Sequence, residues 1–450
     1  MSVRVARAAL LVLVAGLALH NLAMALLWQA GVRDTALDAV AAWKELVLLV
    51  GLVAALAAAR AAPLRLWADR LALVYALLVV LYLLLPQSWL GGEATARGEL
   101  YALRHHLLPV AAYALGRLVG LDAVWWRRIG IAILVVAGAI SLWGLVDVYA
   151  VPLQTWRNSG VPGWYREQLG LTYECLSSLP ENWVLNTGDE QNPLRRLVST
   201  FLSPLATGYA LVVALLLLAA TRRGRWAIAV AGLVFAGLLW THTRSAFVAL
   251  AVGLVVLGLL RRSWREVVLG AASFAVSIGF VLAFPTIGPS TSYTATELAC
   301  LRQNAAVEPE ETQDPLGADD SSTRSHLRNL RDGLESVARH PWGYGLGNAG
   351  VNASRTDVRL QAGESTYTEL GVDTGLAGLA AFAGWLVALG IALARRSAWL
   401  TASLAAVAAI GIQTDVIGIH WVAVTMFALA GASLRAAPRK THKRRGEASR

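Results

Sequence analysis

The chain has 450 residues, of which 56% are hydrophobic and 15% are charged. Soluble domains carry charge on about a quarter of their residues, so this composition excludes an ordinary soluble enzyme. The net charge of +10 would suit a nucleic-acid-binding protein, but the positions of the basic residues, given below, exclude that class.

Apolar segments recur along the whole chain. A hydrocarbon layer of about 30 Å needs roughly 20 apolar residues in a helix. The pattern predicts an all-α polytopic membrane protein with about twelve transmembrane helices. They lie near residues 7–28, 39–61, 71–86, 100–120, 127–146, 205–220, 226–240, 246–260, 267–284 and 376–394, with two more inside 398–434. The first segment shows no small-residue cleavage site, so we expect a retained helix and not a signal peptide.

Two long polar connections divide these helices into three groups. The predicted order is an N-terminal bundle of about five helices (1–150), a first extracytoplasmic loop (151–200), helices 6–9 (201–285), a large extracytoplasmic loop (286–365), helices 10–12 (366–436) and a basic cytoplasmic tail (437–450). An amphipathic helix is expected near 322–339 in the second loop, because Leu327, Leu330, Leu334 and Val337 recur at helical spacing.

The basic residues cluster in alternate connections. Segments near residues 4–7, 60–70, 127–128, 222–225, 261–265, 395–396 and 435–450 hold 22 of the 39 Lys and Arg residues but only three acidic ones. Lys and Arg accumulate in cytoplasmic loops. Both termini are therefore expected in the cytoplasm, and both long loops outside. The positive charge reflects membrane topology and not nucleic-acid binding.

Ionisable residues lie at the expected outer ends of several helices. They are Lys44 and Glu45, Arg104, His105 and His106, Arg195 and Arg196, Arg244, and Asp415 and His420. Any single one is most simply an interfacial or capping residue. Ionisable residues within membrane segments nevertheless tend to mark functional sites. Several arginines on one face suit an anionic group such as a diphosphate.

Four segments resemble, in this order, the conserved blocks of the O-antigen ligase and polymerase superfamily. They are "RRLVSTFLSPLATGYAL" (195–211), "LLWTHTRSAFVAL" (238–250), "SSTRSHLRNLRDGLESVARHPWGYGLG" (321–347) and "GESTYTELGVDTGLAGL" (363–379). The "WKE" at 43–45 and the "LRHHLLP" at 103–109 resemble it more loosely. The ligase pattern is His, then Asn, Ser or Gln, nine residues, Gly, two residues and Gly. Here Glu364 takes the His position, followed by Ser365, Gly375 and Gly378.

The resemblance implies a bacterial membrane glycosyltransferase of the C-type fold. Such an enzyme transfers a glycan from a polyprenyl diphosphate, such as undecaprenyl diphosphate, to an acceptor hydroxyl outside the membrane, with no cofactor or metal. Glu364 is the expected general base, and His340 is the next candidate. The residues expected at the diphosphate or elsewhere on the substrate are Arg104, Arg196, Arg244 and Arg324, with Arg195 and Arg328 as alternates, together with Lys44 and Tyr367.

Four glycines are expected to serve packing. Gly375 and Gly378 predict close helix packing below the site. Gly345 and Gly347 belong to "HPWGYGLGNAG" (340–350), a Pro/Gly-rich loop that cannot be helical and that we expect to fold over the site. No strand or Walker lysine accompanies this loop, so it is not read as a phosphate-binding loop.

The function that fits best is polymerisation of surface polysaccharide repeat units in the cell envelope. Glu in place of His at position 364 favours a polymerase over the alternative, an O-antigen-type ligase that attaches the finished glycan to a lipid or protein. A transporter or flippase of lipid-linked glycans is the alternative of another class. It would more often show charges at the membrane midplane, whereas here they crowd one end.

The expected partners are the lipid-linked oligosaccharide donor, a glycan or lipid-linked acceptor, membrane lipid and other polysaccharide-export proteins, with no nucleic acid. The expected location is the cytoplasmic (inner) membrane. The two cysteines, Cys175 and Cys300, fall one in each long outer loop. Disulfides persist outside the cytoplasm, so the two residues are a candidate disulfide, with two free thiols as the alternative.

Overall fold

The computed structural model describes residues 2–58, 64–186, 192–221, 224–305 and 321–435. The predicted tail at 437–450 and the segment 306–320 of the second predicted loop lie outside the described residues. Helices make up most of the described chain, and β1 (Val184–Leu185) and β2 (Leu194–Arg195) are its only named strands. The predicted fold class, an all-α polytopic membrane protein, is confirmed.

Eight helical segments of the described chain are long and apolar enough to cross a membrane. They are α1 with η1 and α2 (Ser2–Gly16, Leu17–Leu19, His20–Gln29), α3 with α4 (Asp34–Ala41, Trp43–Ala58), α5 (Trp67–Leu84), α8 (Ala123–Ala150), α11 (Pro204–Thr221), α13 (Arg244–Arg261), α14 (Trp264–Ile287) and α18 (Thr366–Ala394). Shorter apolar helices are α12 (Arg225–Trp240), α19 (Ala398–Ile410) and α20 (His420–Leu434).

Helix α7 (Ala96–Val119) is as long as these segments but more polar, because it carries charged residues such as Arg104 and Arg117. It packs closely against α20. A Cβ atom at Gly116 would lie 1.9 Å from the carbonyl oxygen of Ala428, and one at Gly431 would lie 2.3 Å from that of Tyr113. Glycines allow such backbone approach between membrane helices. The polar face of α7 is thereby fixed next to the chain that precedes α20.

Helix α18 is interrupted at Gly375, whose φ of 64° and ψ of −176° are not helical. The loop that follows α16 lies across this break. The amide of Tyr344 donates to the carbonyl oxygen of Val372 at 2.7 Å, and the amide of Leu376 donates to that of Pro341 at 2.8 Å. Backbone polar groups at membrane depth must find partners within the protein. The loop therefore supplies the partners that the broken helix lacks.

Short elements build the two long connections. Between α8 and α11 lie α9 (Leu153–Arg157), α10 (Val161–Gly163), η2 (Trp164–Gln168), η3 (Glu181–Trp183), the antiparallel pair β1–β2, and η4 (Ser199–Phe201). After α14 come α15 (Ala295–Ala305), α16 (Ser321–Arg339) and α17 (Gly350–Ser354), and α6 (Gln87–Leu90) precedes α7. In the strand pair, Val184 lies opposite Arg195 and Leu185 opposite Leu194. A bridge from Leu194 to Ser290 joins the two connections.

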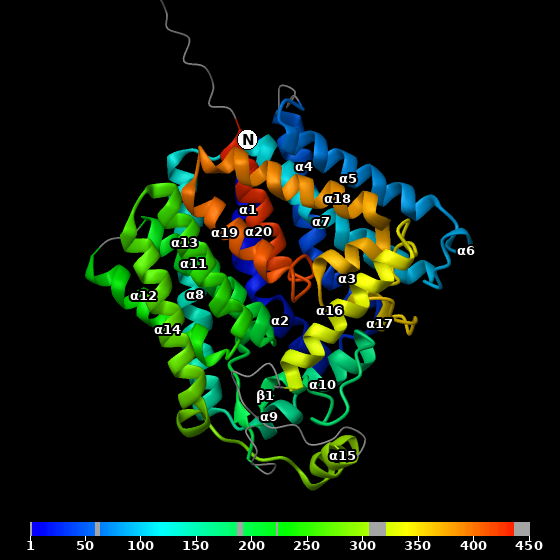
Figure 1. Cartoon of the computed structure of the whole chain (residues 1–450), viewed down its shortest axis with the longest axis vertical. Coiled ribbons are helices and arrows are strands. Elements are labelled where there is room, and N and C mark those ends of the chain that lie inside the picture. The colour runs from blue at the N-terminus through cyan, green and yellow to red at the C-terminus, as the bar shows by residue number, and fades with distance from the viewer. Residues whose placement is uncertain (1, 59–63, 187–191, 222–223, 306–320, 436–450) are drawn as a thin grey trace, which may run out of the picture.

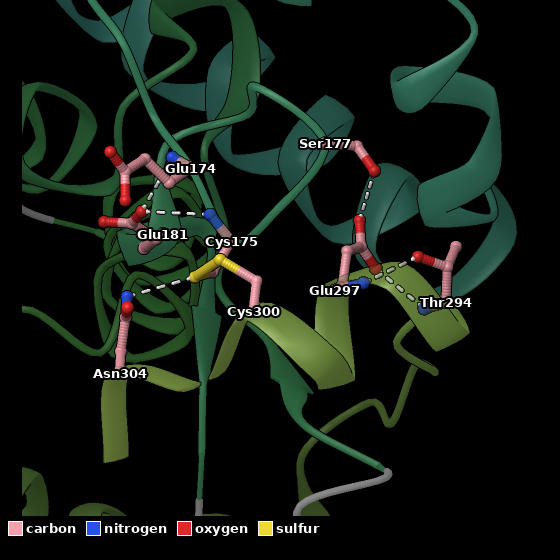
Figure 2. The surroundings of a disulfide bond; sticks show 8 residues. All are labelled: Glu174, Cys175, Ser177, Glu181, Thr294, Glu297, Cys300 and Asn304. Carbon is pink, nitrogen blue, oxygen red and sulfur yellow. Dashed lines mark hydrogen bonds between the residues drawn. A yellow bond between two sulfur atoms is a disulfide. The ribbon is translucent and has the colours of Figure 1, made fainter. Parts of the chain in front are cut away.

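The first long connection is tied to α15, as Figure 2 shows. Cys175 and Cys300 form a disulfide with their Cα atoms 5.4 Å apart. Nearby, the Arg157 guanidinium is 2.6 Å from a Glu297 carboxylate oxygen, and the Ser177 hydroxyl donates to the same carboxylate at 2.6 Å. A covalent bond and a buried ion pair thus hold the two connections together.

Helix α16 lies where an amphipathic helix was expected, and it packs on the first half of α18. A Cβ atom at Gly333 would lie 2.9 Å from Cβ of Thr368. Val337 is buried in this contact, but Leu327 and Leu334 are exposed. The apolar spacing therefore predicted the helix correctly, while its packing uses small residues as much as leucines.

Several connections meet at one end of the bundle, which we call the loop end. It comprises residues 30–33, 85–95, 241–243 and 411–419, and the described parts of 151–203 and 288–365. The Gln168 side chain donates to the Asp34 carbonyl, the Leu197 amide to Trp240, and the Thr366 amide to Gly411. In Figure 1, α9, α10 and α15 lie at the bottom, and the start of the chain lies at the top.

Candidate functional site

Glu364 lies at the loop end, one residue before Ser365, which precedes the first turn of α18. Its backbone φ of 69° is in the left-handed region, which is uncommon for a residue with a side chain. The side chain is 46% exposed, and its carboxylate hydrogen-bonds to His326 of α16. This hydrogen bond lowers the pKa of Glu364 below its ordinary value, although partial burial acts in the opposite direction. Glu364 is therefore an ionised, accessible carboxylate at neutral pH.

The residues after Glu364 bind the segment 411–419. The Ser365 hydroxyl donates to the Gly411 carbonyl at 3.2 Å, and the Thr366 hydroxyl donates to the Thr414 carbonyl at 3.1 Å. The Val416 amide donates to the Thr366 hydroxyl oxygen at 2.9 Å. Segment 411–419 is thus held directly beside Glu364.

A histidine of α7, an acid of α18 and an acid of segment 411–419 lie close together. His105, Glu369 and Asp415 each offer one ligand atom, and these atoms lie within 4.8 Å of one another. The Nε2 atom of His105 is 3.4 Å from an Asp415 oxygen, which also accepts the Gly418 amide at 3.1 Å. Glu369 is 6% exposed. Such a donor set has the chemistry to hold a divalent cation or to share protons.

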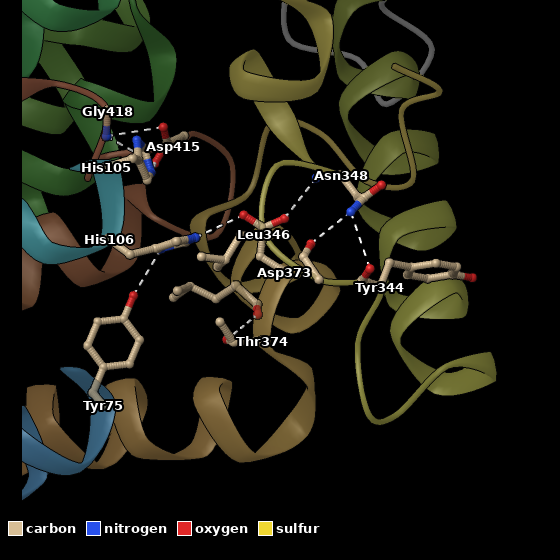
Figure 3. Close-up of polar contacts among 12 residues, drawn as sticks. Tyr75, His105, His106, Tyr344, Leu346, Asn348, Asp373, Thr374, Asp415 and Gly418 are labelled. Atoms are coloured by element: carbon tan, nitrogen blue, oxygen red, sulfur yellow. Dashed lines mark hydrogen bonds and ion pairs between the residues drawn. The ribbon is translucent and has the colours of Figure 1, made fainter. Parts of the chain in front are cut away.

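A second polar chain crosses the bundle just below, as Figure 3 shows. The Nε2 atom of His106 is 2.9 Å from an Asp373 carboxylate oxygen, and Tyr75 Oη is 3.0 Å from His106 Nδ1. The Asn348 amide donates to the other Asp373 oxygen at 3.2 Å. Its side-chain amide donates to the Tyr344 carbonyl at 3.2 Å. This chain fixes α5, α7, α18 and the loop after α16 relative to one another.

Two of the predicted arginines, Arg196 and Arg244, lie close to one another. Arg196 donates to the carbonyl oxygens of Thr241 and His242 at 3.0 and 3.3 Å. Burial and the charge of Arg244 lower the pKa of Arg196 to about 10. A positive charge that burial and a like charge disfavour is well suited to bind an anion.

Tyr209 connects these arginines to segment 411–419. Its hydroxyl is 2.9 Å from the Ser245 hydroxyl oxygen and 2.9 Å from that of Thr414. Ser245 follows Arg244 on α13, and Thr414 precedes Asp415. Residues next to Glu364 are thus bonded to this short segment, and Ser245, next to Arg244, is linked to it through Tyr209. Arg196 donates to the residues just before Arg244.

Arg104 lies on α7, one residue before His105. Its guanidinium is 3.2 Å from a Glu45 carboxylate oxygen and is 38% exposed. Lys44, by contrast, is buried, and its ammonium donates to the Ala41 carbonyl at 2.9 Å. The Tyr367 hydroxyl donates to the Ala408 carbonyl at 2.9 Å. Lys44 and Tyr367 are thus engaged within the helix bundle.

Arg195 does not join Arg196. Its guanidinium is 3.1 Å from Asp147, with exposures of 2% and 0%, and it donates to the Val151 carbonyl at 2.9 Å. The Trp156 indole donates to the same carboxylate at 2.6 Å. Successive side chains of an extended chain point to opposite sides. Arg195 therefore anchors the first long connection, while Arg196 lies near Arg244.

The remaining predicted residues lie on or next to α16. Arg324 and Arg328 belong to this helix, and Arg328 is exposed. His340 follows the helix, donates through Nε2 to the Leu90 carbonyl at 2.6 Å, and stacks on Tyr344 with the ring centroids 4.2 Å apart. His340 thereby ties the loop after α16 to α6.

Each of the four predicted packing glycines is needed for a different structural reason. Gly345 and Gly347 have φ of 96° and 88°, and a Cβ atom at Gly347 would lie 2.8 Å from the backbone of Gly98. Gly375 forms the break in α18. A Cβ atom at Gly378 would overlap the Thr374 hydroxyl oxygen at 2.0 Å. The loop after α16 thus lies on the bundle only because glycines leave room for it.

Sequence reasoning missed His326, Glu369, Asp373 and Asn348. The two acids gave a signal, because carboxylates in an otherwise apolar helix are costly and seldom without a role. His326 and Asn348 gave none, because both lie in polar segments where their residue types are ordinary.

Residues 227–383 match the model of a protein family described as O-antigen ligase. This match supports the resemblance of the chain to the O-antigen ligase and polymerase superfamily. The matched residues run from α12 to the second half of α18 and include Arg244, Glu364 and the break at Gly375. A search among curated proteins finds no match to the chain. The chain is therefore a multi-pass membrane protein, and the family match supports a glycosyltransferase-type activity on lipid-linked glycans.

Proposed function

We propose that the protein polymerises surface polysaccharide repeat units on the outer face of the bacterial cytoplasmic membrane. The donor is a glycan on a polyprenyl diphosphate, and the acceptor is a hydroxyl of a second lipid-linked glycan. The observation that carries this proposal is that segment 411–419 hydrogen-bonds both to Ser365, next to Glu364, and to Tyr209, which contacts Ser245, next to Arg244. Glu364 and Arg244 lie within the region that matches the O-antigen ligase family.

The chemistry divides between a carboxylate and guanidinium groups. The acceptor oxygen bonds to the anomeric carbon, its proton passes to Glu364, and the bond from that carbon to the diphosphate oxygen breaks. Negative charge develops on the leaving diphosphate, where Arg196 and Arg244 stabilise it. Because neighbouring charge and burial disfavour the positive charge of Arg196, an incoming diphosphate gains more from this pair than from a fully solvated arginine.

Guanidinium groups can balance the diphosphate without a metal ion, so we propose a metal-independent reaction. Transfer by the purified protein should survive dialysis against EDTA. Loss of activity that a divalent cation restores would contradict this point. The cation would then be expected at His105, Glu369 and Asp415, whose ligand atoms lie within 4.8 Å of one another.

The second candidate is a ligase that attaches the finished glycan to a lipid or protein. The description of the matched family favours it, whereas Glu at position 364 favours the polymerase. Glycan ladders from cells that lack the gene separate the two. Collapse to single repeat units indicates a polymerase, and long chains left on the lipid carrier indicate a ligase. An unchanged ladder with altered movement of a solute or lipid-linked glycan would indicate a transporter or flippase and overturn both proposals.

The proposal also requires that the loop end faces outward and that both termini face the cytoplasm. Single cysteines at Ser263, between α13 and α14, and at Ser325, on α16, test this orientation. An impermeant thiol reagent added to intact cells should label position 325 and not 263. The reverse pattern would place the site in the cytoplasm and overturn the proposed reaction. Other polysaccharide-export proteins are the expected partners at the loop end.

A further inference from the structure

A polar cavity of about 580 Å³ opens at the loop end, where three connections meet. Its walls come from the start of α7, from the connection between α8 and α11, and from the end of α17. They include four hydroxyl side chains and two guanidinium groups, namely Thr95, Thr172, Ser354, Thr356, Arg97 and Arg355. Pockets for small molecules span about 300–1,000 Å³. The cavity is therefore large enough for part of an oligosaccharide.

Three arginines gather around one aromatic ring beside this cavity. The guanidinium carbons of Arg355, Arg97 and Arg104 lie 4.3, 5.3 and 5.9 Å from the ring centroid of Tyr101. The Arg97 Nε atom also donates to the Tyr101 hydroxyl at 2.7 Å. Stacking on an aromatic face orients guanidinium groups and leaves their edges available for hydrogen bonds.

Two of these three arginines are at ion-pair distance from an acid, and Arg355 is not, within the described residues. Arg104 is paired with Glu45 at 3.2 Å, and Arg97 is 4.0 Å from Asp38. Within the part of the chain that the structure describes, Arg355 has no carboxylate at ion-pair distance, and its Nε atom donates to the Leu169 carbonyl at 3.0 Å.

Two further observations describe the charge at Arg355. Burial lowers the pKa of Arg355 and is the largest cause; Tyr101 and Asp38 raise this pKa, and the charges of Arg104 and Arg97 lower it. Asp357 also lines the cavity but is exposed. Two guanidinium groups and one carboxylate leave the wall net positive, so an anionic ligand gains from entering it.

The position of the cavity connects it to the candidate transfer site. Arg104 lies next to His105 on α7, and His105 pairs with Asp415 of segment 411–419. A glycan whose reducing end lies at Glu364 and Arg244 would extend over the loop end, where this cavity opens.

We propose that this cavity is a glycan subsite that binds a sugar with a negatively charged substituent, such as a uronic acid. Hydroxyl side chains both donate and accept hydrogen bonds and so match the hydroxyls of a sugar. The terminal nitrogens of Arg355, with Arg97 beside them, bind its carboxylate in the planar geometry that guanidinium groups favour. This inference rests on the proposed glycan transfer for the identity of the ligand as a glycan.

Binding of soluble sugars to the purified full-length protein in detergent tests the subsite without any transfer reaction. The probe is a trisaccharide of uronic acids, and its control is the same trisaccharide with each carboxyl reduced to a primary alcohol. We expect the acidic sugar to bind at least about 10-fold more tightly in calorimetry, with an affinity that falls as salt rises. Equal affinity for both sugars, or no binding of either, would overturn the proposal.

Matched variants test whether the acidic sugar binds in this cavity. Arg355→Gln should weaken the acidic sugar on the order of 10-fold, whereas Arg359→Gln, an exposed arginine four residues further on that does not line the cavity, should leave it unchanged. If Arg355→Gln does not fold, Arg97→Gln replaces it, because Arg97 is exposed at the start of α7. If neither variant weakens binding of the acidic sugar, the sugar binds elsewhere, and its assignment to this cavity is wrong.

A lipid phosphate is the other source of the same anionic chemistry. Phosphatidylglycerol added to the detergent should not displace the acidic trisaccharide. If this lipid displaces the sugar while its zwitterionic counterpart does not, the cavity is a lipid-headgroup site, and the glycan assignment fails. Failure of sugar binding would leave the proposed transfer reaction untouched. Conversely, an active Glu364→Gln variant would weaken the proposed function without affecting the binding result.

Discussion

Two polar regions of the loop end both contain a carboxylate with a basic partner, but they differ in how far these side chains are exposed to solvent. In the Arg195 region (Asp147, Trp156 and Arg195), the charges are buried, and Asp147 receives hydrogen bonds from both of the other residues. In the Glu364 region (Glu364 and His326), the carboxylate is nearly half exposed. Buried, mutually paired charges hold a structure in place, whereas an accessible charge with spare hydrogen-bonding capacity can act on a ligand. Exposure and pairing, more than residue type, separate anchoring from function.

The largest expected effect is the loss of transfer in Glu364→Gln. This variant keeps the shape of the side chain but removes the proton acceptor, so transfer should fall on the order of 10²–10⁴-fold, with insertion and donor binding unchanged. The measurement is the rate of glycan transfer by purified protein.

Glu335→Gln is the matched control for Glu364→Gln. Glu335 is a carboxylate on exposed α16 that pairs with Arg331 and Arg339, and its removal should leave the rate unchanged. Near wild-type transfer by Glu364→Gln would move the base elsewhere, with His340 as the next candidate.

The next effect concerns stability, and it arises in the Arg195 region. Arg195→Ala leaves Asp147 buried without its ion-pair partner, which costs about 3–5 kcal/mol. The thermal midpoint in detergent should fall clearly. Arg331→Ala removes an arginine from an exposed pair on α16 and should cost less than about 1 kcal/mol. Equal midpoints for the two variants would show that burial does not distinguish the two kinds of pair.

A smaller loss of stability is expected without the disulfide. Replacing Cys175 and Cys300 by Ser removes a cross-link between residues 125 apart in sequence, and such bonds typically contribute about 2–4 kcal/mol. The Arg157–Glu297 pair still holds α15 in place, so transfer at low temperature should be largely retained. Complete loss of transfer in a folded Ser variant would show that this connection takes part in the reaction.

The smallest effect is a shift in pH dependence. The hydrogen bond from His326 lowers the pKa of Glu364, so the base loses its charge only below the ordinary pH range of a glutamate. His326→Ala removes this bond and should raise the pKa of Glu364, which moves the acidic limb of the kcat/KM profile to higher pH. The rate near pH 7 should change little.

Ser325→Ala, at the adjacent residue, controls for local changes in α16. An acidic limb that stays in place in His326→Ala, or that moves to lower pH, would contradict the proposed contact between His326 and the catalytic carboxylate.

Much of the fold was predictable because membrane-spanning helices need long apolar segments, and these can be recognised in the sequence. Apolar runs of the right length gave twelve helices, and all twelve have counterparts in the described chain. The break in α18 was not predictable in this way. Gly375 suggested close packing, but only the structure shows that the backbone of Pro341–Tyr344 supplies the hydrogen bonds that a broken helix needs.

The candidate site was predictable in its parts and not in its arrangement. Family motifs drew attention to Glu364, Arg196 and Arg244, because each lies in a recognisable stretch. Arg195 shares the same motif, yet the structure turns it toward Asp147. A side chain's direction in a short irregular segment depends on which partner it meets, and no local pattern encodes that choice.

The sequence by itself showed that the protein lies in a membrane, where most of its helices run and which family its central region resembles. It did so because burial preference, helix period and motif spacing are local properties. Only the tertiary structure decided which charges are anchors and which are available. Pairing of Glu364 with His326, of Arg195 with Asp147, and of Arg355 with the ring of Tyr101 joins residues far apart in the chain. Whether a charge finds a buried partner depends on how helices pack, and that is settled only when the whole bundle has folded.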